Sequence, residues 1–185
     1  MEGRGLGGVA RRDRLGRAAD GLTLYRLAVA VALVPVLGAR RTAAAAALLG
    51  TGWISDFLDG RAARASGEPT RLGAYDLWVD TLVGAGAVLG SVAWGWVPSL
   101  VGVSLVVALV AGFALTRNEA LSMLLQAAGY GMVLWRTWAD GHTLALLWLV
   151  TIIAVIGVVN RQILWERSLP TFFGGLGALV RRRGR

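Results

Sequence analysis

Long apolar segments separated by short polar turns restrict how this chain can fold more than any other feature of its sequence. A helix needs about 20 mainly apolar residues to cross a membrane, and only helices and closed barrels satisfy their backbone hydrogen bonds there. The chain has six candidate segments: residues 22–39, 43–59, 73–97, 98–116, 120–135 and 143–160. The second segment ends with two aspartates. We therefore predict an all-α integral membrane protein with six transmembrane helices.

The composition supports a membrane protein and excludes several kinds of chemistry. Of the 185 residues, 56% are hydrophobic, which is high for a soluble domain of this length. The absence of cysteine excludes disulfides, thiolate metal ligands and a cysteine nucleophile. All 19 basic residues are arginine, which excludes a lysine base or Schiff base. Because these arginines flank apolar segments, we expect anionic lipid headgroups and not nucleic acid as partners.

A basic segment lies on each side of the predicted transmembrane domain, which covers residues 22–160. Residues 1–21 interleave five arginines with apolar residues in a loosely helical pattern, which predicts a basic amphipathic juxtamembrane segment. A disordered basic tail is the alternative. The segment lacks the uninterrupted apolar core of a signal peptide, so we expect it to be retained. Residues 161–185 form a predicted basic cytoplasmic tail.

The distribution of arginines predicts the orientation in the membrane. Six spans place both termini on one side, and fifteen of the 19 arginines fall on that side. Arg40, Arg41 and Arg136 fall on the opposite side, and Arg26 lies within the first segment. Short cytoplasmic loops are enriched in arginine and lysine. We therefore expect a multi-pass protein of the plasma membrane whose termini and 60–72 loop are cytoplasmic.

Four aspartates between the second and third segments are the strongest candidates for a functional site. Asp56 and Asp59 are three residues apart, and Asp76 and Asp80 are four apart, so each pair projects from one face of a helix. A short connection would bring the pairs together. Four partly buried carboxylates repel one another unless cations bind them. Mg²⁺ or Mn²⁺, which prefer oxygen ligands, would suit the site and indicate phosphate chemistry.

The spacing of these acids matches a known signature. Asp56 begins the pattern D-x-x-D-G-x-x-A-R, which ends at Arg64. Gly73 follows after eight residues, Asp76 after two more and Asp80 after a further three. This resembles the signature of the CDP-alcohol phosphatidyltransferase family, D-x-x-D-G-x-x-A-R-x8-G-x3-D-x3-D. Six spans with cytoplasmic ends also fit that family.

Further residues refine the resemblance, and two depart from it. Thr23 and Arg26 are similar to the T-x-x-R of phosphatidylglycerophosphate-synthase-like members. The gap between Gly73 and Asp76 is one residue shorter than usual, which puts the role of Gly73 in doubt. Thr81 follows the last acid where many members carry a lysine, which weakens any assignment of the acceptor.

The resemblance implies an enzyme of phospholipid biosynthesis that transfers a phosphatidyl group from CDP-diacylglycerol to an alcohol and releases CMP. It implies that Asp80 is also the general base for the acceptor hydroxyl. The implied metal ligands are Asp56, Asp59, Asp76 and Asp80, and the implied CDP-diacylglycerol-binding residues are Thr23, Gly60, Ala63 and Arg64. Gly60 and Ala63 are small enough for close approach of the nucleotide, and Arg64 offers a planar donor fork for phosphate.

Glycerol 3-phosphate is the acceptor that the resemblance favours, giving phosphatidylglycerophosphate. Arg117, with Glu119 two residues later, resembles a pair found in phosphatidylglycerophosphate synthases. Arg26 and Arg71 are further candidates for binding an anionic acceptor, and Arg161 is a weaker one. Phosphatidylglycerol, which would give a cardiolipin, inositol phosphate and serine remain open as acceptors.

Two other functions and one assembly are compatible with the sequence. A metal-ion or proton-coupled transporter would also carry acidic residues within the membrane. The acidic residues of segment 98–160 are Glu119 and Asp140 alone, so a translocation path for ions would have no continuation there. A catalytically inactive scaffold is permitted by the shortened gap. Gly84, Gly86 and Gly90 predict close approach of another helix, and with the family resemblance they make a homodimer plausible.

Overall fold

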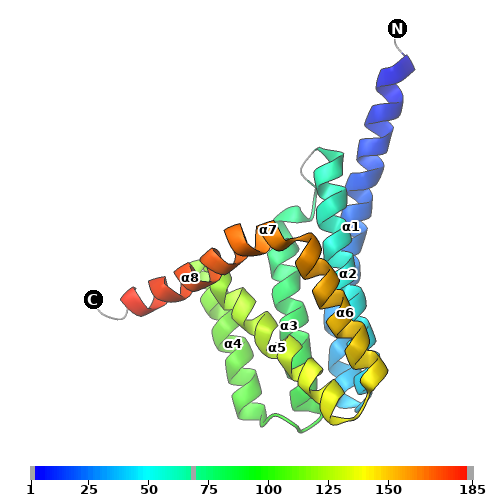
Figure 1. Ribbon diagram of the computed structural model, residues 1–185. Helices are drawn as coiled ribbons and strands as arrows, with labels where there is room; N and C mark the ends of the chain where they lie inside the picture. The colour runs from blue at the N-terminus through cyan, green and yellow to red at the C-terminus, as the bar shows by residue number, and fades with distance from the viewer. Residues whose placement is uncertain (1–2, 68–69, 183–185) are drawn as a thin grey trace.

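The computed structural model describes residues 3–67 and 70–182, and within these ranges its regular structure is helical throughout (Figure 1). The main helices are α1 (Gly3–Gly38), α2 (Thr42–Ser66), α3 (Asp76–Ala93), α4 (Ser99–Thr116), α5 (Glu119–Ala139), α6 (Thr143–Val159) and α8 (Leu169–Arg182). Shorter elements are η1 (Gly73–Tyr75), α7 (Arg161–Ile163) and η2 (Leu164–Ser168). The prediction of an all-α protein is confirmed for this part of the chain.

Helix α1 is continuous from the basic N-terminal residues into the first apolar segment. There is no break near residue 21, so the predicted juxtamembrane segment and the first span form one helix. The N-terminal part extends beyond the bundle, whereas the C-terminal part packs against α2 and α3 (Figure 1). Val29, Leu33 and Leu37 are at most 2% exposed in that packed part. Burial of its apolar face therefore fixes α1 next to α2 and α3.

Helix α2 begins with an alanine-rich stretch and ends before the connection to α3. Alanine has the highest helix propensity, and residues 43–47 are all alanine. Ala45, Ala46 and Leu49 are fully buried against α1 and α6. Gly67 then adopts a left-handed conformation with φ 71°, which ends the helix. Pro69, whose sequence position predicts a helix break, lies outside the described residues.

The glycines of α3 allow α1 and α5 to approach it closely within one chain. A Cβ atom on Gly90 would lie 2.7 Å from the carbonyl oxygen of Leu33 in α1. A Cβ atom on Gly84 would lie 2.9 Å from Cα of Gln126 in α5. The predicted close approach of a helix is therefore confirmed, but its partners belong to the same molecule. These glycines consequently give no support for a homodimer.

Three helices of the described chain are long and apolar enough to span a membrane, or four if one bent pair is counted as a single span. The three segments are Arg12–Gly38, Gly73–Ala93 and Ser99–Thr116. Helix α6 is strongly apolar but has only 17 residues, and the end of α2 carries acids and arginines. The structure thus supports an integral membrane protein, while the number of six spans stays a prediction.

The residues after α6 turn sharply and cross the ends of the bundle. The segment from Arg161 is bent by 81° relative to α6 and continues as helix through Arg182 (Figure 1). Asn118, which also caps α5 through Ala120 N–H, donates from Nδ2 to the carbonyl oxygen of Gly175 at 3.0 Å. The predicted basic tail is therefore helical where the structure describes it, and α8 is fastened to the start of α5.

Candidate functional site

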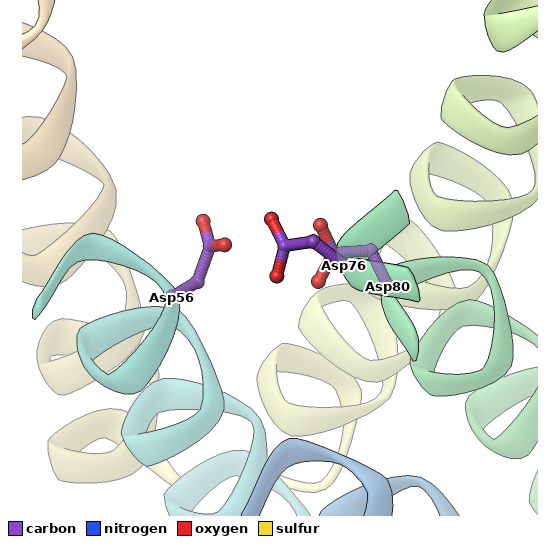
Figure 2. Close-up of side chains that lie close together, drawn as sticks. All are labelled: Asp56, Asp76 and Asp80. Atoms are coloured by element: carbon purple, nitrogen blue, oxygen red, sulfur yellow. The ribbon is translucent and has the colours of Figure 1, made fainter. Parts of the chain in front are cut away.

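The ends of α2 and α3 bring the aspartates of the signature together. Asp56 and Asp59 lie near the end of α2, whereas Asp76 is the first residue of α3 and Asp80 follows one turn later. The η1 turn over Gly73–Tyr75, where the spacing is one residue shorter than in the signature, leads directly into α3. Figure 2 shows Asp56 facing Asp76 and Asp80 across a gap between the two helices. One oxygen from each of these three carboxylates lies within 4.8 Å of the others.

Arg26 of α1 forms ion pairs with all four aspartates. Its Nη1 atom donates to Asp56 at 2.7 Å and also to Asp80. Its Nη2 atom donates to Asp59 and Asp76. The arginine side chain is only 1% exposed, so a fully buried guanidinium ties α1 to both α2 and α3. A buried guanidinium is stable only with such partners.

The site keeps a surplus of negative charge after this pairing. Four ionised carboxylates and one guanidinium leave a formal charge of −3. The side chains of Asp56 and Asp76 are 49% and 41% exposed, whereas those of Asp80 and Asp59 are 20% and 7% exposed. The two more open carboxylates are therefore the ones that an approaching cation or substrate meets first.

Asp59 occupies a different position from the other three acids. It is not part of the group of carboxylates that could share one ion. Thr23 Oγ1 lies 3.3 Å from its Oδ2 atom and 3.2 Å from the carbonyl oxygen of Ala19, and it donates to these acceptors. The two residues of the T-x-x-R pattern, Thr23 and Arg26, thus both contact Asp59. The sequence spacing gives no reason to distinguish the four acids, whereas the structure separates Asp59 from the other three.

The small residues and the arginine of the signature lie along α2 beyond the acids. Gly60 and Arg64 follow Asp56 at intervals of four residues, so the three share one face of the helix. A Cβ atom on Gly60 would lie 3.4 Å from Nη1 of Arg64, which shows that the guanidinium folds back over this glycine. Ala63, which is partly buried, lies one turn beyond Asp59. A glycine and an exposed arginine therefore follow the carboxylates along α2.

Three of the four arginines considered for the acceptor, Arg26, Arg71 and Arg117, lie in different surroundings. Arg26 is occupied by the four acids, and Arg71 lines a separate cavity. Arg117, which is exposed and has φ 54°, places its guanidinium 5.5 Å from the ring centroid of Trp78. Trp78 projects from α3 on nearly the opposite side from Asp76 and Asp80. The structure therefore does not bring Arg117 or Arg71 to the carboxylates.

Helix α5 contributes residues that the sequence did not predict. A cavity of about 50 Å³ beside the acids is lined by Arg26, Gly52, Trp53, Asp56, Asp80, Val83, Gln126 and Tyr130. Gln126 and Tyr130 are four residues apart on α5, and Tyr130 packs edge-on against Trp53 with centroids 5.3 Å apart. Gly129 in the same turn meets Gly84 of α3. That glycine was the sequence signal that could have placed α5 at the site.

The fold and the site together define an integral membrane protein with an acidic, cation-compatible site at one end of its bundle. The family model for CDP-alcohol phosphatidyltransferase matches residues 17–173, so the chain belongs to this family. Its members are enzymes that transfer substituted phosphate groups from CDP-alcohols in phospholipid biosynthesis. Comparison with curated proteins and with solved structures found no significant match.

The carboxylates fit the divalent metal on which the family generally depends. Three oxygen donors converge from α2 and α3, and the surplus charge of the site favours a dication. All-oxygen donor sets suit Mg²⁺ and Mn²⁺ better than softer metals. The donor chemistry is therefore compatible with either ion.

Proposed function

We propose that this protein transfers a phosphatidyl group from CDP-diacylglycerol to an alcohol, releasing CMP, at the cytoplasmic face of the plasma membrane. The observation that carries the proposal is the convergence of Asp56, Asp76 and Asp80 around the buried Arg26. A divalent cation bridging phosphate oxygens is the usual means of handling a pyrophosphate donor. The family match supplies the class of reaction.

The acids would hold the metal, which we propose to be Mg²⁺ or Mn²⁺. Asp56, Asp76 and Asp80 are the ligands that the geometry supports, and Asp59 completes the ligand set that the signature implies. When bound, the ion would neutralise negative charge on the pyrophosphate and on the leaving phosphate oxygen. Arg26 holds the carboxylates from α2 and α3 at a fixed separation, and Thr23 orients Asp59.

The signature residues on α2 would bind the cytidine nucleotide of the donor. Gly60 has no side chain, so a nucleotide can approach the backbone there, and Ala63 adds little bulk. Arg64 lies over Gly60 and can donate two hydrogen bonds to a phosphate group. Thr23, on the facing helix α1, borders the same region through its contact with Asp59.

Asp80 is our candidate for the general base. It would accept the proton of the acceptor hydroxyl while that oxygen forms a bond to the phosphorus of the phosphatidyl group. The bond between this phosphorus and the bridging oxygen breaks, and CMP leaves with the electron pair. Asp80 is 20% exposed and lines the small cavity beside the acids, so a hydroxyl can reach it. Positioning supplies much of the acceleration because a carboxylate is a weak base for an alcohol.

Glycerol 3-phosphate is the acceptor that we propose, with phosphatidylglycerol, inositol phosphate and serine as alternatives. The support comes from the Thr23/Arg26 and Arg117/Glu119 patterns. Arg26 pairs with the acids and Arg71 lines a separate cavity, so Arg117 remains the leading candidate for the acceptor phosphate. To reach an acceptor, the exposed guanidinium of Arg117 would have to move away from the Trp78 ring. This would lose about 0.5–1 kcal/mol of cation–π energy, which an ion pair with phosphate can offset.

The proposal is tested by CMP release from the detergent-purified full chain with CDP-diacylglycerol, Mg²⁺ or Mn²⁺, and each acceptor in turn. We expect release that needs metal, one acceptor and Asp80, measured with Asp80→Asn. Glu166→Gln, an exposed acid on η2, is the matched control and should remain active. Metal-independent release, or full activity of Asp80→Asn, would contradict the proposal.

A further inference from the structure

A second and larger cavity lies outside the acid site, between the N-terminal half of α1 and the end of α2. Its volume of about 500 Å³ is within the usual range for sites that bind small molecules. The lining residues are Arg12, Asp13, Gly16, Arg17, Asp20, Ser66, Thr70 and Arg71. All of them except Gly16 carry polar or charged side chains, so the cavity is suited to a polar ligand.

One face of α1 forms one wall of this cavity. Asp13, Gly16, Arg17 and Asp20 are spaced at three, four and seven residues, which places them on the same side of the helix. A Cβ atom on Gly16 would meet nothing within 4 Å, so the missing side chain leaves open space. The wall is therefore indented at Gly16 and charged on both sides of it.

Ser66 at the end of α2, with Thr70 and Arg71 before η1, forms the opposite wall, and the adjacent Leu72 is hydrogen-bonded to α1. The backbone N–H of Leu72 donates to Oδ1 of Asp20 at 2.9 Å. This bond fixes the residue next to Arg71 against α1. Arg71 and Arg17 thus line the same cavity from two different segments, and this bond connects the two walls independently of any ligand.

The arginines of the cavity are available to an anion. The ion pairs of the described side chains involve Arg26 and Arg136, so no described carboxylate pairs with Arg12, Arg17 or Arg71. Arg17 donates from Nε to the carbonyl oxygen of Asp13 at 3.4 Å, which leaves its two terminal nitrogens unused. Three guanidinium groups and two carboxylates give the lining a formal charge of +1. Arginine pairs well with phosphate because it can donate two parallel hydrogen bonds.

This cavity is separate from the acid site in position and in charge. Asp20 precedes Arg26 by six residues, a rise of about 9 Å along a helix. Ser66 follows Asp59 by seven residues, a rise of about 10 Å. The acid site, at −3, repels a free phosphate, whereas the lining of the cavity attracts one. A phosphate bound at the cavity would therefore not need a divalent metal.

We propose that this cavity binds a phosphate group without divalent metal, at a site distinct from the carboxylates that handle the CDP-alcohol. The phosphate belongs either to the headgroup of an anionic membrane lipid or to a soluble phosphate ester. The proposal goes beyond the transfer reaction and does not depend on it. In the simpler alternative, these arginines only set the orientation of the protein in the membrane. Replacing Arg14 or Arg17 would then have the same effect on phosphate binding.

Binding is measured on the purified full chain in the presence of a metal chelator. One arm titrates inorganic phosphate and glycerol 3-phosphate by calorimetry. The other arm compares nanodiscs of phosphatidylcholine alone with nanodiscs that also hold phosphatidic acid, read by native mass spectrometry of retained lipid. Binding in the first arm assigns the site to a soluble phosphate, and binding in the second assigns it to a lipid headgroup. Binding in neither arm overturns the proposal.

Two pairs of variants on α1 separate a built site from general positive charge. Arg17→Gln should weaken binding about tenfold, the loss of roughly one charge-assisted hydrogen bond, whereas the exposed Arg14→Gln should not. Gly16→Leu should fill the cavity and weaken binding with every charge kept, whereas Gly21→Leu, which also has open space, should leave it unchanged. Equal effects within either pair would overturn the proposal. Both leucine variants remove a helical glycine, so neither is expected to unfold α1.

Discussion

The two ends of the helical bundle each hold an arginine against aspartate, fully buried for Arg26 and partly buried for Arg136, and they differ in how the charge is balanced. At the far end Arg136 pairs with Asp140 at 2.9 Å and lies 4.3 Å from the Trp94 ring centroid, while Thr42 donates to the same aspartate at 2.5 Å. One positive charge there meets one negative charge. At the signature end Arg26 meets four carboxylates.

This difference indicates which cluster is structural and which is functional. The far cluster connects the start of α2, the residue after α3 and the end of α5, and it needs nothing more for neutrality. The signature cluster connects α1, α2 and α3 but keeps three surplus negative charges, which weaken the fold unless a cation binds. A protein selected only for stability would gain by losing some of these acids. The surplus is therefore best explained by metal and phosphate chemistry.

The largest contrast is expected when one acid is neutralised at each end. Asp80→Asn should lower the rate of CMP release by about 10²- to 10⁴-fold, the usual contribution of a positioned base. Asp140→Asn should retain most of the activity, because Asp140 contacts Thr42 and Arg136 and no part of the acid site. Steady-state CMP release measures both. Similar losses in the two variants would remove the distinction between the ends.

Removing the two arginines compares their contributions to stability. Arg26→Gln should lower the free energy of unfolding by about 3–5 kcal/mol, because it leaves four carboxylates without their counter-charge. Arg136 is 29% exposed and loses one ion pair, so Arg136→Gln should cost less. Thermal unfolding in detergent gives both values, and added Mg²⁺ should recover part of the loss only for Arg26→Gln. A larger loss for Arg136→Gln would contradict this comparison.

Within the signature cluster, the acids should differ in how they support metal binding. At a free Mg²⁺ concentration of 100 times Kd, bound metal should stabilise the native protein by about 2.7 kcal/mol. Asp56→Asn should abolish this stabilisation, because Asp56 belongs to the converging group. Asp59→Asn should reduce it less, because Asp59 lies deeper and contacts Thr23. Unfolding with and without Mg²⁺ checks the order, and the reverse order would show that Asp59 is the principal ligand.

At each end of the bundle a threonine donates a hydrogen bond to an aspartate, Thr23 to Asp59 and Thr42 to Asp140. Replacing either threonine should have the smallest effect on stability of these substitutions. Thr23→Val and Thr42→Val each remove the hydrogen bond to an aspartate with little change of shape and should cost about 0.5–1.5 kcal/mol of stability. Only Thr23→Val should also slow CMP release, because it leaves Asp59 less well oriented. Unchanged release in Thr23→Val would limit this threonine to a structural contribution.

Local spacing was sufficient to predict the helices and the meeting of the acids. Asp56 and Asp76 lie on elements that follow one another along the chain, so a short connection determines their approach. The glycines of α3 likewise indicated a close helix contact, although not that its partners are α1 and α5. The structure supports three or four spans where the apolar segments predicted six, because length and apolarity fall short in several helices.

The contacts that the sequence did not predict depend on packing between distant segments. Arg26 was considered for the acceptor, yet it binds carboxylates 30 to 54 residues away. Arg117 lies over Trp78 because α4 packs on the face of α3 opposite the acids. Tyr130 reaches the site through the close contact of Gly129 with Gly84. In each case the helix register had to be known before the side chain could be placed.

Binding of Mn²⁺, followed by electron paramagnetic resonance of the free ion, tests most directly whether the surplus carboxylates at the signature end bind a metal. The wild-type chain and Asp140→Asn should bind Mn²⁺, whereas Asp76→Asn should lose most of this binding because it removes one of the three converging ligands. Mn²⁺ binding that persists in Asp76→Asn, or that is absent from the wild-type chain, would contradict the assignment of the signature end as a metal site.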